Sequence, residues 1–429
     1  MFEGLKNLVP QTVKNYYHLI VAGLAALFFR FPARGLKIIG VTGTDGKTTT
    51  VHMIYHLLKE AGEKVSMIST VKAVIGEKEY STGLHVTTPN SFQIQRLLRE
   101  MVDAGSEIAV VEITSHGLDQ NRVAFIPIYT AVITNVTHEH IDYHGSFAAY
   151  LEAKAKILRG AKYRVLNCDD ANFEVLKHSG SGLLISFGLA EKADFRGSSL
   201  TETTSGVSFK ASFKNKQKKK ISENVLLPVL GRFNSYNALA ALVTVCSLGI
   251  EADEVADKFS TFQLPQGRMQ VVSEGQDFYV IVDFAHTPAA LDNALKSLKE
   301  YTHHQIISVF GAAGERDRMK RAAMGKVSTE LADLSIFTSE DPRNEDPGEI
   351  IEQIATGAIA AGGSLNQTFW KIASRAEAIN LAVKNLARKG DIVAIFGKGH
   401  EASMNIGGQE IPWNDEEVAR KALRARLIK

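Results

Sequence analysis

Short apolar runs alternate with longer amphipathic segments between residues 36 and 262. The apolar runs are rich in β-branched residues, which is typical of buried strands in a parallel sheet. Strands that alternate with helices in this way indicate a mostly parallel α/β architecture. The expected strands are 37–41, 107–114 and 130–136, and the expected helices are 51–61, 93–104 and 150–158.

The alternation of strands and helices begins again after the segment LPQGRM, residues 264–269. This segment combines proline with glycine and is typical of an interdomain hinge. The count of elements beyond it predicts a second, smaller doubly wound domain. The expected strands are 278–284, 305–311, 334–339 and 391–396, and the expected helices are 287–299, 319–332, 347–361 and 375–387.

Two segments depart from this rhythm. Residues 200–230 alternate at a period of two around lysines 214–220, which predicts a solvent-facing hairpin with a charged tip. A nucleic-acid patch is the alternative, but no aromatic platform accompanies the lysines.

The segment Tyr16–Pro32 contains an apolar core at Leu19–Phe29, which is shorter than the ~20 residues that span a bilayer. We expect a helix packed on the body of the protein, and contact with a membrane surface or a partner remains open.

Length and composition narrow the class of protein. A chain of 429 residues predicts two or three domains, and a net charge of +2 implies no polyelectrolyte partner such as nucleic acid. Cys168 and Cys246 have neither metal-ligand spacing nor a disulfide framework. Together with the lack of a signal-peptide cleavage site, they indicate a reducing, cytoplasmic location.

The stretch GLKIIGVTGTDGKTTT reads as a strand, a phosphate-binding turn and the start of a helix. Gly43 and Gly46 let the backbone direct its N–H groups toward an anion. Lys47 adds a positive charge, and Thr48 carries a hydroxyl that can bind magnesium. We therefore expect this loop to bind the phosphates of a nucleotide.

Other polar residues follow strands that should end at the same edge of the sheet. Glu112 comes directly after one apolar run, and His140 and Asp142 follow another. Magnesium prefers hard oxygen ligands, and the ends of parallel strands meet at the ligand crevice. The second half adds DFAHTP, GERD and GKGHE at strand ends, and the turn EDPR presents Arg343 for bidentate contact with a carboxylate.

Eleven motifs in order resemble the Mur ligases, the ATP-dependent enzymes that add amino acids to the peptidoglycan stem peptide. The similarity is greatest to the tripeptide-synthetase branch, which adds diaminopimelate or lysine. The resemblance implies a P-loop-type, mostly parallel central domain and a smaller Rossmann-like C-terminal domain. The motifs are TGTDGKTTT, TTPN, EITSHGLDQNRV, NVTHEHIDYHG, YLEAK, GRFNSYNALAA, GRM, DFAHTP, GERD, EDPR and GKGHE.

The resemblance also implies site residues and cofactors, namely ATP and Mg²⁺. The catalytic residues that it implies are Lys47, Glu112, His140 and Lys154. The implied metal ligands are Thr48, Glu112, His140 and, if it is carbamylated, Lys154. ATP contacts fall to Gly43, Thr44, Asp45, Gly46, Lys47, Thr48, Thr49, Asn237, Arg268, Asp283 and His286. The acceptor, a muramoyl peptide, would meet Thr87, Thr88, Ser115, His116 and Arg122, and the amino acid would meet Arg316, Asp341, Arg343, Gly397 and Glu401.

The chain departs from the family pattern at several positions. Asp45 stands where the phosphate loop usually has Asn, and Glu139 stands where Asp usually precedes the histidine. In the amino-acid motif, Glu340 and Asp341 stand where the diaminopimelate branch has Asp-Asn. Because Arg343 is kept, we expect a diacid amino acid rather than lysine, although Asp341 could equally select a more cationic substrate.

Few residues precede the phosphate loop, so we expect that the family's uridine-binding domain is missing or replaced by the hydrophobic segment. The expected division is 1–35, a hydrophobic helical segment, 36–264, the ATP-binding domain, and 265–429, the amino-acid-binding domain. Two alternatives stay open: a ligase acting on a lipid-linked or other non-UDP acceptor, and a nucleotide-binding regulatory protein without catalysis.

Overall fold

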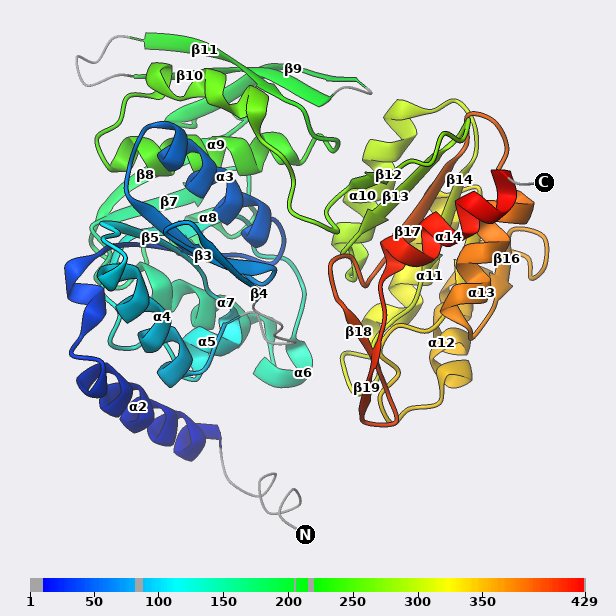
Figure 1. Cartoon of the computed structure of the whole chain (residues 1–429), viewed down its shortest axis with the longest axis horizontal. Helices are drawn as coiled ribbons and strands as arrows, with labels where there is room; N and C mark the ends of the chain where they lie inside the picture. The colour runs from blue at the N-terminus through cyan, green and yellow to red at the C-terminus, as the bar shows by residue number, and fades with distance from the viewer. Residues whose placement is uncertain (1–10, 82–87, 204–205, 215–219, 428–429) are drawn as a thin grey trace.

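A computed structural model describes residues 11–81, 88–203, 206–214 and 220–427 of the chain. Figure 1 shows two lobes side by side, a larger one built from the first part of the chain and a smaller one built from the second. Each lobe is a twisted sheet with helices on both faces. The predicted α/β class, with a large, mostly parallel sheet and a second, smaller one, is confirmed.

The large lobe contains an 11-stranded sheet in the order β11-β10-β9-β8-β7-β6-β1-β5-β2-β3-β4. Its centre is parallel, and both ends are antiparallel: β9, β10 and β11 at one edge, β2, β3 and β4 at the other. The central strands are buried on both faces, which explains their continuous apolar runs. The strands are β1 (Lys37–Thr42), β2 (Val65–Ile68), β3 (Lys72–Ile75), β4 (Lys78–Ser81), β5 (Ile108–Glu112), β6 (Ile128–Ile133), β7 (Tyr163–Asn167), β8 (Leu183–Gly188), β9 (Phe195–Thr203), β10 (Gly206–Lys214) and β11 (Lys220–Leu227).

Helices cover both faces of this sheet and form two apolar cores. The helices α3 and α9 contribute to one core, and α4 and α7 contribute to the other. Local signals fix where several helices begin: the Asn90 side chain accepts from Gln93 N in a capping box at the start of α4. The helices are α3 (Lys47–Glu60), α4 (Ser91–Asp103), α5 (Ser115–Asp119), α6 (Ile141–His144), α7 (Phe147–Ala155), α8 (Phe173–Leu176) and α9 (Asn234–Ser247).

The small lobe contains a six-stranded sheet in the order β12-β13-β17-β14-β15-β16, in which only β12 is antiparallel to its neighbour. Helices α10, α11 and α12 pack on one face, and α13 and α14 pack on the other. The elements are β12 (Gln270–Val272), β13 (Tyr279–Asp283), α10 (Pro288–Tyr301), β14 (Ile306–Phe310), α11 (Met319–Leu331), β15 (Leu334–Phe337), α12 (Pro347–Ala360), β16 (Phe369–Lys371), α13 (Arg375–Asn380), β17 (Ile392–Phe396) and α14 (Asp415–Leu427).

A two-stranded ribbon completes the small lobe. It consists of β18 (Ser403–Ile406) and β19 (Gln409–Pro412), and the sequence pattern did not predict it. Arg343 N donates to Asn405 O at 3.0 Å, so the ribbon holds the EDPR turn in place. A π-helical turn also follows α13, at 381–386, where one continuous α-helix was expected to residue 387.

The N-terminal hydrophobic segment forms the helix α2 (Gln11–Phe28). Its Ala22, Ala25 and Ala26 side chains are buried, and the helix packs against α4, as expected for a helix on the body of the protein. Among the described residues, no helix is both long and apolar enough to span a membrane. The predicted lysine hairpin is formed by β10 and β11, and its tip, 215–219, lies outside the described residues.

Candidate functional site

The loop between β1 and α3 has the conformation expected of a phosphate-binding turn. Gly43 and Gly46 have φ angles of +154° and +80°. A Cβ at Gly43 would lie 1.9 Å from Thr134 Oγ1, and a Cβ at Gly46 would lie 2.3 Å from Asn237 Oδ1. Both positions therefore exclude a side chain for steric reasons as well as for backbone strain. In this structure Lys47 Nζ donates to the carbonyl oxygens of its own loop, to Gly43 O at 3.1 Å and to Thr44 O at 2.7 Å.

Two oxygen ligands suited to magnesium meet at the start of α3. The Thr48 hydroxyl lies 3.0 Å from both carboxylate oxygens of Glu112, and Thr70 N donates to Glu112 Oε2 at 2.9 Å. Glu112 is 1% exposed, at the carboxyl end of β5. Within the described part of the chain, no cluster of three or more His, Cys, Asp or Glu side chains is arranged to hold a metal. Magnesium commonly binds through one or two carboxylates and the phosphates of its substrate, so this pair fits it.

The partly exposed His140 and the buried Lys154 lie beside the same loop. Burial, with further contributions from His116, Lys154 and Lys47, lowers the pKa of His140 to about 3, so its imidazole is neutral and can accept a metal. Lys154 is 2% exposed and its Nζ donates to Gly43 O at 2.5 Å. Burial, followed by the charge of Lys47, holds the pKa of Lys154 well below its usual value. A neutral amine is the form that reacts with carbon dioxide, which fits carbamylation.

Residues of the small lobe reach the phosphate loop. One Arg268 guanidinium nitrogen lies 3.3 Å from Thr48 Oγ1, and the guanidinium stacks over the Phe284 ring at 4.5 Å. Glu139 of the large lobe lies between His140, at 3.6 Å, and His286 of the small lobe, at 3.3 Å. The two lobes therefore meet directly at the loop that the sequence assigned to phosphate.

Asp283 and Asn237 occupy structural positions at the edges of this region. Asp283 Oδ2 accepts from Met269 N at 2.7 Å and Oδ1 accepts from Ala285 N at 2.7 Å, so the carboxylate fixes the segment that carries Arg268. Asn237 accepts from the Thr50 hydroxyl at 3.3 Å. Both side chains are therefore already hydrogen-bonded within the protein.

The predicted amino-acid residues come from three turns of the small lobe. Asp341 and Arg343 have positive φ angles of 39° and 54°, which bend the EDPR turn sharply. Lys398, which is fully buried, pairs with Asp341 at 2.7 Å and with Glu401 at 2.5 Å. Asp341 Oδ1 also accepts from Asn405 N at 2.9 Å. The Asp341 carboxylate is therefore already occupied by a cation and a backbone donor.

Three side chains that received no site role from the sequence support or line this region. Arg321 is fully buried in α11 and binds Glu345 at 2.8 Å, which links the GERD loop to the EDPR turn. Glu340 is buried, and its Oε2 has no hydrogen-bond partner among the described residues. Burial raises the pKa of Glu340 to about 7. Lys320, which donates to His286 O at 2.9 Å, lies close enough to oppose that shift.

The predicted acceptor residues lie near α5. The His116 ring contacts the Tyr143 ring, with centroids 4.1 Å apart, and burial lowers the pKa of His116 to about 4. Arg122 donates to Thr88 O at 2.9 Å, while Ser115 lies 3.1 Å from His144 Nε2. Thr87 lies outside the described residues.

A single cavity of about 590 Å³ between the lobes gathers most of these side chains. Lys154, Gly43, Thr88 and Ser115 are near it but do not line it. The predicted residues that line it are Thr44, Asp45, Gly46, Lys47, Thr48, Thr49, Glu112, His116, Arg122, His140, Asp142, Asn237, Arg268, Asp283, His286, Arg316, Asp341, Arg343, Gly397 and Glu401.

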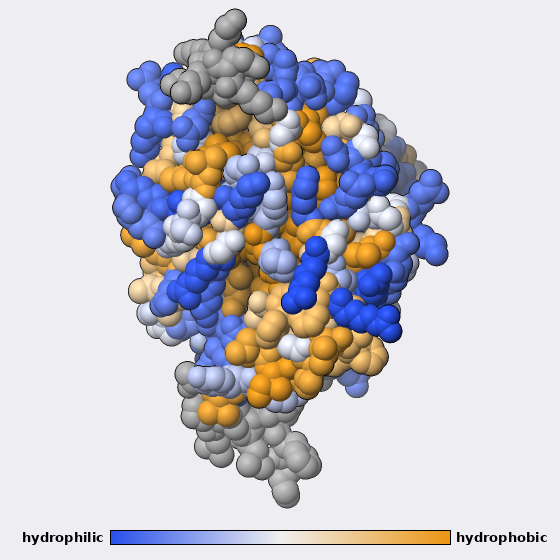
Figure 2. All heavy atoms as spheres, turned by 90° about the vertical axis from the view of Figure 1, so that its left-hand side faces the viewer, coloured by the Kyte–Doolittle hydropathy of each residue, from blue (hydrophilic) through white to orange (hydrophobic). Residues whose placement is uncertain are grey.

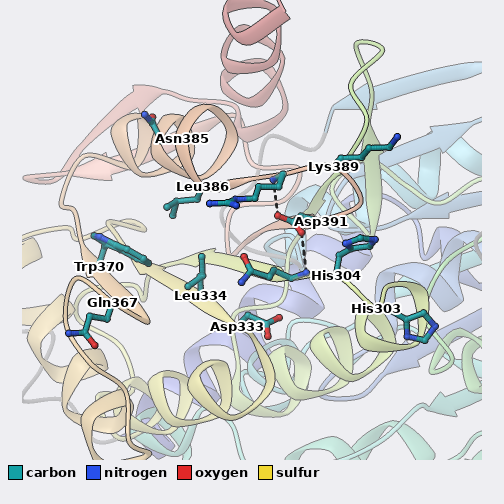
Figure 3. A pocket seen from close by; sticks show the side chains of 12 residues that line it. His303, His304, Asp333, Leu334, Gln367, Trp370, Asn385, Leu386, Lys389 and Asp391 are labelled. Carbon is teal, nitrogen blue, oxygen red and sulfur yellow. Dashed lines mark hydrogen bonds between the residues drawn. The ribbon is translucent and has the colours of Figure 1, made fainter.

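A larger, more open cavity of about 800 Å³ lies elsewhere in the small lobe (Figure 3). It is at the amino ends of the strands, whereas ligands of open α/β sheets bind at the carboxyl ends. Its Asp391 carboxylate accepts hydrogen bonds from Gln305 N at 3.1 Å and from Arg388 N at 2.7 Å, so both of its oxygens are already bonded to the backbone. The interlobe cavity is therefore the candidate active site.

Comparison with known proteins agrees with this geometry. The model of the Mur ligase middle domain matches residues 41–245, and that of the Mur ligase glutamate ligase domain matches 267–399. UDP-N-acetylmuramoyl-L-alanyl-D-glutamate–2,6-diaminopimelate ligase of Geobacillus thermodenitrificans is 37% identical over 427 residues, covering 97% of this chain and 85% of that protein. The chain belongs to the Mur ligase family. UDP-N-acetylmuramyl-tripeptide synthetase of a Roseiflexus species is also 37% identical, over 420 residues, covering 94% of this chain and 81% of that protein.

Solved structures of Mur ligases and related enzymes share the fold. A UDP-N-acetylmuramoyl-L-alanyl-D-glutamate–2,6-diaminopimelate ligase aligns with a TM-score of 0.63 at 32% identity, over 94% of this chain and 82% of that one. Folylpolyglutamate synthase of Mycobacterium tuberculosis, complexed with ADP and AMPPCP, aligns with a TM-score of 0.70 at 17% identity, over 88% of this chain and 92% of that one. The second likeness concerns the fold alone.

Proposed function

We propose that this Mur ligase uses ATP to join 2,6-diaminopimelate to UDP-N-acetylmuramoyl-L-alanyl-D-glutamate in the synthesis of peptidoglycan precursors. One observation carries the proposal: the phosphate loop of the large lobe and the Arg316 and Arg343 side chains of the small lobe line the same cavity. The relatives that carry these substrate names are 33–37% identical to this chain and cover 94–97% of it.

The proposed reaction has two steps. A carboxylate oxygen of the acceptor attacks the γ-phosphorus of ATP, the bond to the β–γ bridging oxygen breaks, and ADP leaves. The amino group of the incoming amino acid then attacks the acyl phosphate, loses a proton and displaces inorganic phosphate as the amide forms. Lys47 and Arg268 would offset charge on the phosphates, and contact between the lobes would exclude water that hydrolyses the intermediate.

Magnesium would neutralise the phosphate oxygens and orient them for attack. We assign its protein ligands to Thr48, Glu112 and His140, with Lys154 added if the amine carries a carbamate. Burial of Lys154 and the lowered pKa of its amine favour that modification. The remaining nucleotide contacts are assigned to Gly43, Thr44, Asp45, Gly46, Thr49, Asn237, Asp283 and His286.

The proposed amino-acid subsite favours a diacid over lysine. Arg316 and Arg343 supply positive charge that would pair with the second carboxylate of diaminopimelate. Asp341, the residue that could have attracted a cationic side chain, is paired with Lys398 at 2.7 Å. Gly397 and Glu401 complete the subsite, and Thr88, Ser115, His116 and Arg122 are assigned to the acceptor.

Phosphate release with chosen substrates tests this proposal. We expect release from ATP only when the UDP-linked dipeptide and diaminopimelate are both present, and much less with lysine. Parallel reactions with a lipid-linked muramoyl dipeptide measure the choice of acceptor. Phosphate release that ignores either substrate would contradict a ligase, and equal turnover of lysine would contradict the proposed role of the two arginines.

A further inference from the structure

The helix α2 carries an unusual distribution of apolar residues. A surface helix normally packs its apolar stripe inward and exposes its polar side chains. In α2 the buried face consists of small side chains, Ala22, Ala25 and Ala26, and the large apolar side chains point outward. The outward-facing residues, which we call the α2 stripe, are Val13, Tyr16, Tyr17, Ile20, Leu24, Leu27 and Phe28, with exposed fractions from 55% to 72%.

The α2 stripe is continuous along the helix. At 3.6 residues per turn its members fall within an arc of about 120°, on the side opposite the buried alanines. Its C-terminal end continues onto α4, where the Phe92 ring lies 6.2 Å from the Phe28 ring and is 43% exposed. Figure 2 faces this side of the molecule and shows hydrophobic side chains gathered toward its lower end, next to the grey atoms.

The α2 helix and the segment that follows it carry basic side chains and no acidic ones. Residues 11–44 contain no Asp or Glu, and they include Lys14, Arg30, Arg34 and Lys37. At least three of these basic side chains, Arg30, Arg34 and Lys37, are exposed. The neighbouring acidic residues of α4 and α5 are already paired: Glu100 with Arg96, Asp103 with Arg99, and Asp119 with Lys156.

We propose that the α2 stripe docks on the surface of an anionic lipid bilayer, with α2 lying in the plane of the interface. Apolar and aromatic side chains on one face, bordered by basic residues, are what such helices use to bind acidic lipid headgroups. A second copy of this chain fits less well, since a symmetric antiparallel pair of α2 helices would bring Lys14 of one copy toward Arg30 of the other with no acidic partner.

Docking in this way would orient the active site. Gln11 Nε2 donates to Tyr143 OH at 2.8 Å, and Asn15 Nδ2 donates to Asp119 Oδ2 at 3.3 Å. The first half of α2 is therefore hydrogen-bonded to α5 and α6, whose His116 and Asp142 line the cavity. A docked chain would hold the acceptor end of the cavity beside the lipid surface.

Vesicle flotation of the full chain tests the proposal. We expect the protein to float with vesicles of phosphatidylcholine and phosphatidylglycerol, and roughly tenfold less with phosphatidylcholine alone. The paired change Ile20→Glu with Leu24→Glu should reduce flotation on anionic vesicles by roughly tenfold or more, and Ile20→Ser with Leu24→Ser should also reduce it. The matched control is Val175→Glu with Ile359→Glu, which adds the same charge at side chains that are 59% and 61% exposed elsewhere.

Thermal melting and nucleotide affinity, measured on each variant, separate loss of docking from loss of folding. Both should match the unmodified chain, because none of the four positions lines the active-site cavity. Absence of flotation by the unmodified chain would overturn the proposal, as would equal flotation of the α2 and control variants. Light scattering tests whether a second copy of the chain binds the α2 stripe instead. If the unmodified chain is a dimer and Ile20→Glu with Leu24→Glu makes it a monomer, the stripe is a dimer interface and the proposal is overturned.

Discussion

Two glycines of the large lobe share a backbone conformation and differ in their surroundings. Gly46, in the phosphate loop, has φ +80°, and Gly62, after α3, has φ +81°. A Cβ at Gly46 would lie 2.3 Å from Asn237 Oδ1, whereas a Cβ at Gly62 would have no neighbour within 4 Å. The pair therefore separates the cost of a left-handed backbone from the cost of a steric clash in the loop.

We predict that Gly46→Ala weakens ATP binding by roughly tenfold or more, while Gly62→Ala leaves it unchanged. Each change should lower the free energy of unfolding by about 1 kcal/mol through backbone strain. Only Gly46→Ala also moves Asn237 or the loop itself. Calorimetric titration with a non-hydrolysable ATP analogue measures the difference, and equal affinities in the two variants would contradict the assigned role of the loop.

Lys154 offers a test of catalysis that leaves the nucleotide site in place. It is buried and donates to Gly43 O at 2.5 Å but does not line the cavity. We predict that Lys154→Ala lowers kcat by about 100-fold or more, because a carbamate there would help to place the metal. ATP affinity should change little, and the exposed Lys162→Ala serves as the control.

A regulatory protein without catalysis would give a different result for Lys154→Ala. Its nucleotide affinity would be unaffected in both lysine variants, and there would be no turnover to lose in the unmodified chain. Mass spectrometry of the intact chain in bicarbonate, with and without Lys154, would in addition detect the carbamate directly.

At the scale of elements, the pattern of the sequence predicted the strand ends that carry chemistry. The β1–α3 loop, Glu112 at the end of β5 and Arg343 after β15 were all found where the apolar runs end. Such positions are predictable because parallel strands must be apolar inside the sheet and place polar residues at its carboxyl edge. The division at residues 35 and 264 stays a prediction.

Long-range pairs were not predictable in the same way. The sequence predicted a helix over 319–332, but it did not predict that Arg321 within this helix is fully buried and paired with Glu345 from a later turn. The pairing of Lys398 with Asp341 and the β18–β19 ribbon that holds Arg343 also depend on tertiary contacts. Such tertiary pairs leave no periodic pattern in the local sequence, so the sequence alone does not predict them.

The Arg321–Glu345 pair gives a prediction on stability. The hydrogen bond from Arg321 lowers the pKa of Glu345 from 4.5 to about 2, so the ionised carboxylate favours the folded state. That contribution is complete above about pH 5 and is lost as the pH falls toward 2. Glu345→Gln should lower the free energy of unfolding at pH 7 by roughly 1–3 kcal/mol and flatten its decline between pH 5 and pH 2.

Urea unfolding followed by tryptophan fluorescence measures this effect. Both tryptophans, Trp370 and Trp413, belong to the small lobe that contains the pair, so the signal reports the relevant half of the molecule. Glu349→Gln, an exposed change on α12, is the control. A parallel pH dependence in Glu345→Gln and the unmodified chain would contradict the assigned role of the pair.

For the whole molecule, the central feature is that two lobes contribute to one cavity. Arg268 of the small lobe lies 3.3 Å from Thr48 of the large lobe, and Glu139 lies 3.3 Å from His286. ATP and the amino acid would therefore approach from opposite walls and react only where the lobes meet. In the proposed mechanism, the acceptor carboxylate itself must take up the γ-phosphoryl group in this cavity.

Transfer of an oxygen isotope tests that requirement most directly. The acceptor dipeptide, labelled with ¹⁸O at both oxygens of the reacting carboxylate, is incubated with ATP and diaminopimelate. The mass of the released phosphate is then measured by mass spectrometry. The account predicts one ¹⁸O atom from the carboxylate in each phosphate, because the acyl phosphate leaves that oxygen on phosphorus when the amide forms. Phosphate that carries no label would show that water, and not the acceptor, attacks ATP, and would contradict the account.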